Sequence, residues 1–300
     1  MKADSALLLI LSSSFSPFER TFVEKIQNTK SELLETAIGI AREAGALLLD
    51  YYRRGVRVEY KGEVDIVTEA DRDSEKLIVE KLRQHFPDHA VVAEEGGGHD
   101  GASGYRWFID PLDGTTNFAH TFPMFCVSMA VERDGDLLAG VIFDPTHDEL
   151  FTAEKGCGAR LNNQPIHVSR VNRLEEALVS TGFPSKKRHK NANIHYYHQI
   201  SMRSHGVRRA GSAALDLAYL AAGRLDGFWE FNLHPWDFAA GTLIVEEAGG
   251  TVTEMNGRPH HADSPNTAGS NGLLHAQLLE AFQEIAAGKY RAALPEIKPL

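Results

Sequence analysis

Apolar residues recur at helical spacing along the first part of the chain. Over residues 34–48 they fall three or four positions apart, so they share one face of a helix. Thr29 is followed three positions later by Glu32, which is the spacing of a capping box at a helix start. The pattern therefore predicts a long helix that begins near residue 30 and buries one side.

A second helix is predicted from Thr68, because Asp71 follows it at the same capping distance; the helix should end near residue 86. Asp134-Gly135 predicts a tight hairpin between two of the strand-like segments that come next. These segments span residues 90–93, 105–109, 125–131, 137–143 and 150–153.

Shorter elements alternate in the second half of the chain. Because strands and helices are mixed there without strict strand–helix–strand alternation, the pattern predicts a layered α+β fold. We expect an N-terminal extension at residues 1–28, two halves at 29–170 and 171–290, and a tail at 291–300. The strands predicted in the second half span 177–181, 228–231 and 251–254, and the helices 212–222, 236–248 and 273–287.

Composition narrows the class of protein. The chain has 300 residues, of which 43% are hydrophobic and 24% charged, so it can bury a large core and is not disordered throughout. Its net charge of -10 repels nucleic acid and anionic membranes as a whole, although a local basic patch could still bind either. It also repels an anionic substrate, unless bound cations reverse the field at the site. No stretch approaches the roughly 18 apolar residues of a membrane helix. The apolar run at 6–11 lacks a convincing cleavage site, so we expect a poorly ordered extension or an upstream start codon and not a secretion signal.

The two cysteines indicate a reducing compartment. Cys126 lies in an apolar run and is typical of a buried small hydrophobe, whereas Cys157 lies between glycines in a predicted turn. Neither pattern predicts a disulfide framework or a cysteine metal site. We therefore expect a cytoplasmic protein.

Candidate chemistry concentrates at residues 110–116, with the sequence Asp-Pro-Leu-Asp-Gly-Thr-Thr, directly after a predicted strand. Two carboxylates so close repel each other unless a cation lies between them. Hard divalent cations such as Mg²⁺ take oxygen ligands of this kind. If Gly114 opens a helix, free backbone N–H groups also face an anion there. The same residues are common in ordinary turns, so the run alone fits either a turn or a metal and phosphate site.

Other acids stand at the ends of predicted elements. Glu94-Glu95 follows a strand, and Asp71 and Asp237 lie at helix starts. Taken singly, the first pair fits a solvated loop and the other two fit helix caps. Functional sites are usually built at the ends of regular elements, so the four positions together favour a site.

In combination these segments resemble the inositol monophosphatase family over roughly residues 31–287. The motifs are DIVTEAD at 65–71, EE at 94–95, WFIDPLDGTTNF at 107–118, WDFAAG at 236–241 with EAGG at 247–250, and RAGSAALDL at 209–217, which is similar to the bacterial branch. The resemblance implies an αβαβα sandwich that hydrolyses myo-inositol monophosphate with Mg²⁺ and water. It also implies inhibition by lithium and a homodimer.

The resemblance implies metal ligands by position. Glu94, Asp110 and the carbonyl of Leu112 would hold one Mg²⁺, and Asp110, Asp113 and Asp237 a second. Glu94 would share a third, weaker ion and belong to the catalytic residues, and Asp237 would also contact the substrate. The first half of the chain would thus carry most metal ligands.

The resemblance also implies catalytic and substrate-binding roles. Thr115, paired with Asp71, would orient the attacking water and help to deprotonate it. The N–H groups of Gly114 and Thr115 would contact the phosphate. Glu230 would receive substrate hydroxyls beside a loop formed by Gly211, Ser212 and Ala213. No cysteine or histidine nucleophile is required, so His120 and His234 are expected to be structural, as histidine packs and hydrogen-bonds in many ways.

Some alternatives stay open. Lys61 matches a basic residue near the metals, although its spacing to Asp71 is one residue shorter than in the animal enzymes. Related phosphatases cleave fructose 1,6-bisphosphate, histidinol phosphate or 3′-phosphoadenosine 5′-phosphate, but residues 115–118 resemble the inositol phosphatases. Some bacterial relatives associate with the transcription machinery. The basic run at 186–190 offers a contact for such a partner, or is a solvated loop.

Overall fold

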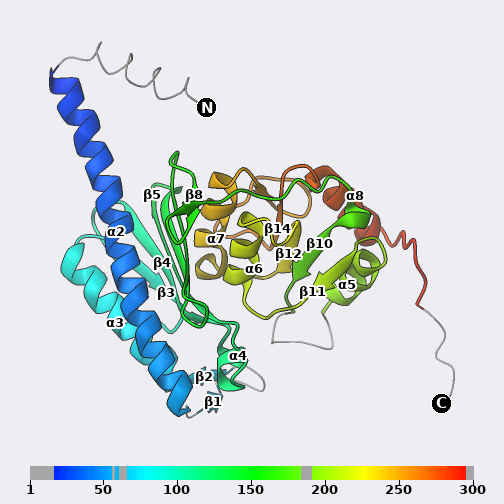
Figure 1. Ribbon diagram of the computed structural model, residues 1–300, viewed down its shortest axis with the longest axis horizontal. Helices are drawn as coiled ribbons and strands as arrows, with labels where there is room; N and C mark the ends of the chain where they lie inside the picture. The colour runs from blue at the N-terminus through cyan, green and yellow to red at the C-terminus, as the bar shows by residue number, and fades with distance from the viewer. Residues whose placement is uncertain (1–16, 56–57, 61–65, 184–190, 295–300) are drawn as a thin grey trace.

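The computed structural model describes residues 17–55, 58–60, 66–183 and 191–294. Helices and sheets alternate in five layers (Figure 1). One pair of helices covers a seven-stranded sheet, a second pair lies between that sheet and a five-stranded sheet, and a third pair covers the far side. The predicted α+β class and αβαβα sandwich are confirmed.

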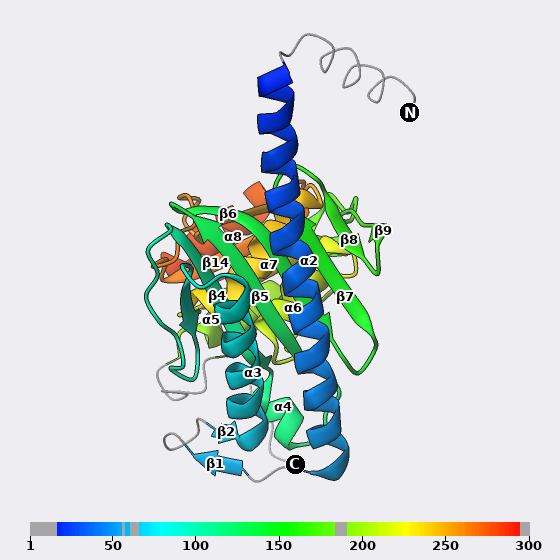
Figure 2. The same ribbon diagram turned by 90° about the vertical axis from the view of Figure 1, so that its left-hand side faces the viewer.

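The first outer layer holds α2 (Pro17–Arg54) and α3 (Glu69–His85), and Figure 2 shows α2 crossing the sheet and extending beyond it. The predicted helix start near residue 30 is wrong. No glycine or proline stands between Pro17 and Gly39, so nothing interrupts the helix at the capping pair. The buried face overlaps the predicted one at Ala37, Ala41, Ala44 and Leu48. Leu33 and Ile40 are also buried, whereas Leu34 and Ile38 of the predicted face are only partly buried.

The first sheet has the strand order β3-β4-β5-β6-β7-β8-β9. β3 pairs parallel with β4, and the other neighbours are antiparallel. Asp134 and Gly135 have φ values of 55° and 91°, the left-handed conformations that a two-residue hairpin needs, so the predicted hairpin is confirmed. The strands are β3 (Ala90–Ala93), β4 (Tyr105–Asp113), β5 (Cys126–Arg133), β6 (Asp136–Asp144), β7 (Glu149–Glu154), β8 (Ala159–Leu161) and β9 (Gln164–Pro165).

Strand β4 continues past its predicted end at residue 109. Its register with β5 shifts between Asp110 and Asp113. Pro111 lies in this irregular segment, and a proline without an N–H is tolerated in a sheet where the ladder is broken by a bulge. The bulge therefore places two carboxylates and a proline at the end of a buried strand.

The middle layer holds α6 (Ala213–Ala221) and α7 (Pro235–Glu247). Every residue from Phe238 to Val245 is buried, because α7 lies between two sheets and has no solvent face. The second sheet has the order β11-β10-β12-β14-β13. Its strands are β10 (Leu178–Thr181), β11 (Gly206–Arg208), β12 (Gly227–Phe231), β13 (Thr251–Thr253) and β14 (Asn266–Ser270).

The third helical layer holds α5 (Asn193–Ser201) and α8 (His275–Ala286). The sequence did not predict α5, β11 or β14. β14 reads Asn-Thr-Ala-Gly-Ser, a polar run that becomes a buried strand because β12 and β13 pair with it on both sides. The remaining elements are β1 (Val58–Tyr60), β2 (Ile66–Thr68), α4 (Thr115–Ala119) and η1 (Leu174–Glu176).

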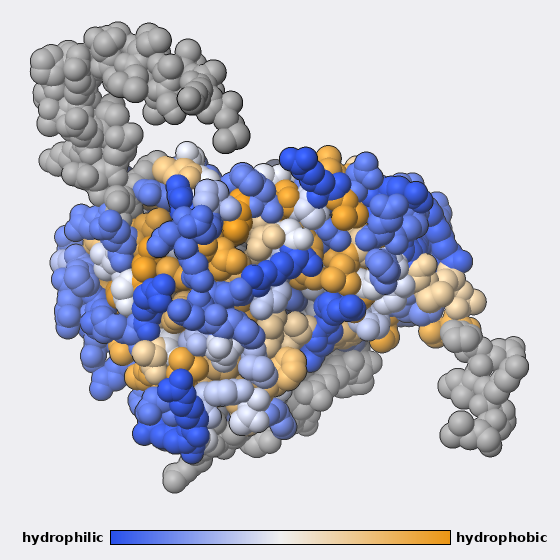
Figure 3. All heavy atoms as spheres, in the orientation of Figure 1, coloured by the Kyte–Doolittle hydropathy of each residue, from blue (hydrophilic) through white to orange (hydrophobic). Residues whose placement is uncertain are grey.

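The surface seen in Figure 3 is hydrophilic over the outer layers at both sides, with hydrophobic residues between them. Across the described part of the chain, no helix combines the length and apolar character needed to cross a bilayer.

Candidate active site

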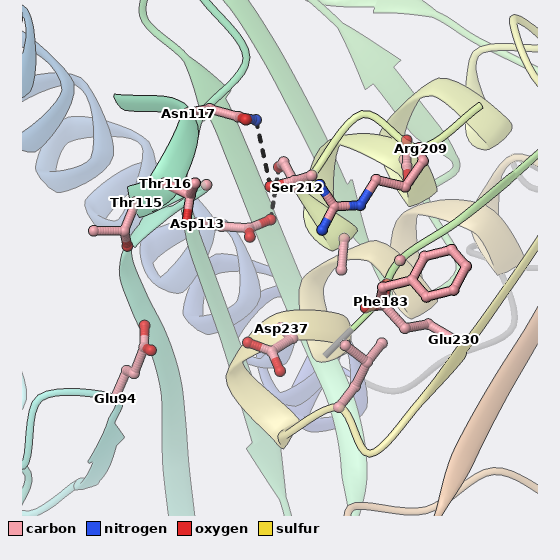
Figure 4. A pocket seen from close by; sticks show the side chains of 16 residues that line it. Glu94, Asp113, Thr115, Thr116, Asn117, Phe183, Arg209, Ser212, Glu230 and Asp237 are labelled. Atoms are coloured by element: carbon pink, nitrogen blue, oxygen red, sulfur yellow. Dashed lines mark hydrogen bonds between the residues drawn. The ribbon is translucent and has the colours of Figure 1, made fainter. Parts of the chain in front are cut away.

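A cleft of about 210 Å³ opens where the two sheets and the middle helices meet. Figure 4 shows side chains of β4, α4, β12 and α7 around it, together with Glu94 after β3 and Ser212 before α6. The residues that line it are Glu94, Asp113, Gly114, Thr115, Thr116, Asn117, Gly182, Phe183, Arg209, Gly211, Ser212, Ala213, Asp216, Glu230, Leu233 and Asp237.

The bulge of β4 supplies two carboxylates. Asp110 is buried, and its Oδ1 accepts a hydrogen bond of 3.0 Å from the Leu112 N–H. Asp113 Oδ2 accepts from Ser212 Oγ and from Ala214 N, both at 2.7 Å. Ser212 is also the N-cap of α6. The start of α6 is therefore attached to a carboxylate about a hundred residues earlier in the chain.

Burial and mutual repulsion disfavour the charged form of the neighbouring carboxylates at this end of the cleft. Burial raises the pKa of Asp110 well above its usual range, and the charges of Glu94, Asp113 and Asp237 raise it further. Burial raises the pKa of Asp113 to about 6, although the Ser212 hydroxyl and nearby N–H groups favour its charged form. Burial and Asp113 likewise raise the pKa of Asp237. A cation among these groups would relieve the repulsion.

Glu94, Asp110, Asp113 and Asp237 all carry carboxylates, and carboxylate oxygens are ligands that suit a hard divalent cation. In the described part of the chain, no three histidine, cysteine or carboxylate side chains are grouped closely enough to hold an ion as they stand. Asp237 is fixed by its own helix, because its Oδ2 accepts at 2.7 Å from the His234 N–H in a capping box. Ion binding would therefore draw the other side chains together around fixed positions.

A hydroxyl–carboxylate pair lies beside these acids. Thr115 Oγ1 is 3.0 Å from Asp71 Oδ1 and 3.1 Å from the Leu112 carbonyl oxygen, so its one proton serves either acceptor. Asp71 is buried, and its other oxygen accepts from Thr68 N at 2.8 Å and Thr68 Oγ1 at 2.6 Å. Burial raises the pKa of Asp71, against these hydrogen bonds. The pair can orient a water molecule and take up its proton.

The start of α4 faces the same cleft. Gly114 is the residue before the helix and has φ 96°, and a Cβ there would lie 2.7 Å from the Met124 carbonyl oxygen. Only glycine suits this position. The first N–H groups of α4 have no partner within the helix and are available to an anion.

Glu230, at the end of β12, lines the other end of the cleft. It is buried, and burial raises its pKa well above the usual range, with contributions from the charges of Asp216 and Asp113. Arg209 acts in the opposite direction. A Cβ at Gly182, directly after β10, would overlap the Glu230 carboxylate, so the carboxylate keeps this position only while residue 182 has no side chain. A carboxyl of this kind can exchange hydrogen bonds with a polyol.

The structure brings most of the predicted site residues into one cleft. Asp71, Asp110 and Leu112 do not line it: Asp71 and the Leu112 carbonyl contact Thr115, which does, and Asp110 accepts from the Leu112 N–H. The others line it directly: Glu94, Asp113, Gly114, Thr115, Gly211, Ser212, Ala213, Glu230 and Asp237. Lys61 and the basic run at 186–190 lie outside the described residues. His234 caps α7 and stacks on Trp236 with ring centroids 4.7 Å apart, a structural position.

Sequence reasoning missed several lining residues. Asn117 Nδ2 donates to the carbonyls of Met124 and Ala210, both at 2.8 Å, and so joins α4 to the loop before α6. Its place inside the motif at 107–118 was the available signal. Arg209 and Asp216 lie inside the motif at 209–217, which was again the available signal. Phe183 and Leu233 reach the cleft through the packing of the second half, and no local pattern marks them.

Comparison with known proteins gives a consistent result. The profile of the inositol monophosphatase family matches residues 29–287. An inositol-1-monophosphatase from Mesorhizobium japonicum is 41% identical over 259 residues, which are 85% of this chain and 97% of that protein. The Nus factor SuhB from Pseudomonas aeruginosa is 42% identical over 259 residues, 84% of this chain and 96% of that one. The solved structure of the extragenic suppressor protein suhB from Bartonella henselae is 42% identical, with a TM-score of 0.80, covering 83% of this chain and 98% of that chain.

Proposed function

This chain belongs to the inositol monophosphatase family, and we propose on that premise that it hydrolyses myo-inositol monophosphate with Mg²⁺ and water. The observation that carries the proposal is the charge pattern of the cleft. One end holds carboxylates whose pKa values are raised by burial and by one another, and the other end holds the buried acid Glu230. The first end suits cations and phosphate, and the second suits the hydroxyls of a polyol.

The Mg²⁺ ligands in this proposal are the side chains of Glu94, Asp110, Asp113 and Asp237 with the carbonyl of Leu112. Two or three ions would neutralise four carboxylates that otherwise repel one another and any phosphate. When bound, Mg²⁺ supplies positive charge that offsets the phosphate and favours ionisation of the attacking water. Phosphoryl transfer then needs mainly positioning from the protein.

The chain's own residues orient the reaction. Thr115 Oγ1 accepts a proton from the attacking water while it donates its own to Asp71 Oδ1, 3.0 Å away. Asp71 is suited to this because burial raises its pKa while Thr68 fixes its orientation. The N–H groups at the start of α4 hold phosphate oxygens. Glu230 binds the hydroxyls of the substrate and sets its orientation.

A substrate panel tests the assignment. Purified protein with Mg²⁺ is given inositol 1-phosphate, fructose 1,6-bisphosphate, histidinol phosphate and 3′-phosphoadenosine 5′-phosphate, and kcat/KM is measured for each. We expect inositol 1-phosphate to be preferred and turnover to fall in tens of millimolar Li⁺. A tenfold preference for the nucleotide would show that the substrate is wrong, and full activity in Li⁺ would count against a close functional match.

A second candidate function rests on the name of the Pseudomonas relative, a Nus factor at 42% identity. We propose that this chain also associates with the transcription machinery and that it forms a homodimer. Affinity capture from lysate, with the natural sequence and with charges reversed at 186–190, measures recovery of RNA polymerase. Equal recovery of RNA polymerase with both proteins would show that the basic run is not the contact. Light scattering of the purified chain measures whether it is a homodimer.

A further inference from the structure

Helix α3 contacts three segments of the cleft through one turn of its surface. Asp71 accepts from Thr115 at the start of α4, as described above. Ser74 Oγ donates to the Pro111 carbonyl in the bulge of β4 at 2.9 Å. Glu75 accepts from the chain that follows β3. Positions separated by three and four residues lie on the same face of a helix, so these three buried side chains form one row.

The Glu75 contact has a specific form. Its Oε2 accepts from the Glu95 N–H and its Oε1 from the Gly97 N–H, each at 2.7 Å. The Glu75 side chain is almost fully buried, with 4% of the residue exposed. Gly96, between the two donors, has φ 92° and forms the tight turn around which the carboxylate closes. Hydrogen bonds from N–H groups to a carboxylate are about twice as strong as neutral ones.

The loop that Glu75 holds begins with Glu94. On its other side Glu94 is fixed by its own N–H, which donates to the Ile109 carbonyl of β4 at 3.3 Å. The direction in which the Glu94 side chain enters the cleft is therefore set by β4 before it and by the Glu75 clamp after it. Three glycines follow at 96–98, and His99 after them pairs with Val91 of β3 through two backbone hydrogen bonds of 2.8 and 2.9 Å. The clamp therefore holds the middle of a glycine-rich loop whose two ends are attached to the sheet.

We propose that Glu75 is a positioning residue that fixes Glu94 and thereby sets the affinity of the cleft for divalent cations. The inference rests on the proposed function, since Glu94 is there a Mg²⁺ ligand. Outer partners that orient metal ligands typically contribute about 10- to 100-fold to metal affinity. Because Glu75 acts on the backbone one residue beyond Glu94, we expect an effect near the lower limit, about tenfold.

The chain contains a matched control. Glu247, at the end of α7, accepts from Gly156 N and Gly158 N, also at 2.7 Å each. The two clamps have the same chemistry: one glutamate, two backbone donors two residues apart, and a glycine-containing turn. The Glu247 clamp holds the turn between β7 and β8, and Glu247, Gly156 and Gly158 do not line the cleft.

The test compares Glu75→Gln with Glu247→Gln. An amide keeps one acceptor oxygen and points an NH₂ group at the second N–H, so each variant breaks half of one clamp. Hydrogen exchange of the metal-free protein is expected to quicken at 95–97 in Glu75→Gln and at 156–158 in Glu247→Gln. Calorimetric titration with Mg²⁺, without substrate, is expected to give a dissociation constant about tenfold higher in Glu75→Gln and unchanged in Glu247→Gln.

A second variant changes the loop that the Glu75 clamp holds. A Cβ at Gly97 would lie 2.7 Å from Glu75 Oε1, so Gly97→Ala forces the carboxylate and the loop apart and disrupts the clamp without changing Glu75 itself. It is expected to weaken Mg²⁺ binding in the same direction, and it carries the test if Glu75→Gln does not fold. If a folded Glu75→Gln or Gly97→Ala variant binds Mg²⁺ with unchanged affinity, or if Glu247→Gln loses as much affinity, the inference is overturned and the proposed function is not affected. Absence of Mg²⁺ binding by the natural chain overturns the proposed function and the inference together.

Discussion

Replacing Asp113 by asparagine is expected to abolish phosphatase activity and, without divalent cations, to stabilise the fold at neutral pH. Asparagine has the shape of a protonated aspartate, and its oxygen can still accept from Ser212 Oγ and Ala214 N, which share one oxygen of Asp113. The substitution therefore keeps these two hydrogen bonds and removes the charge. The proposed metal site needs this negative charge, whereas the same charge destabilises the fold when no metal ion is bound.

The magnitude follows from the pKa of Asp113, which burial raises from 3.8 to about 6. A raised carboxyl pKa means that the folded state binds the proton more tightly than the unfolded state, so the charged form opposes folding. This penalty is absent below pH 3.8 and fully present above pH 6. At about 1.4 kcal/mol for each pH unit, a shift of about two units corresponds to roughly 3 kcal/mol at pH 7.5.

Urea unfolding of both proteins in EDTA, at pH 4.5 and pH 7.5, measures the difference. We expect Asp113→Asn to be more stable than the natural chain by a few kcal/mol at pH 7.5, with the gap shrinking towards pH 4.5. Mg²⁺ at about a hundred times its dissociation constant should stabilise the natural chain by about 2.7 kcal/mol and largely close the gap. A variant less stable at pH 7.5, or a gap that does not change with pH, would refute the electrostatic reasoning. Retained Mg²⁺-dependent turnover would overturn the metal assignment.

Three further predictions concern single side chains. Thr115→Val should lower kcat at least about 100-fold, because the proton path to Asp71 is lost, whereas Thr115→Ser should keep most of the activity. Single-turnover assays measure both variants, and equal rates would contradict the role of Thr115. Asn193→Ala should lower the free energy of unfolding by about 1–3 kcal/mol, because the buried Trp229 N–H loses its 2.6 Å partner. Urea titration measures this change, and an unchanged free energy of unfolding would contradict it. A thiol reagent should modify one cysteine in the native protein, the exposed Cys157, and a second only after denaturation, because Cys126 is buried and its thiol pKa is raised by burial; two fast thiols in the native state would contradict this packing.

Much of the fold could be predicted from local pattern. The buried stripe of α2 and the helix start at Thr68 follow from side-chain spacing, and the hairpin at Asp134-Gly135 follows from its turn residues. In each case the residues that fix the structure lie within one or two turns of one another. The start of α2 could not be predicted in this way, because Thr29 and Glu32 have capping spacing and are also tolerated inside a helix. β14 could not be predicted either, because its polar sequence becomes a strand only through its partners.

In the candidate site, too, some features could be predicted from local sequence and others could not. The sequence itself brings Asp110, Asp113 and the first N–H groups of α4 within seven positions, and the family motifs predict which acids belong with them. Only the tertiary structure decided how these groups act on one another. The raised pKa values come from burial among distant carboxylates, and Asp113 is held by a hydroxyl about a hundred residues away. The Glu75 clamp likewise joins a helix to a loop twenty residues later. Short-range spacing specifies which groups are present, whereas burial and charge interactions depend on distances in space that no local pattern contains.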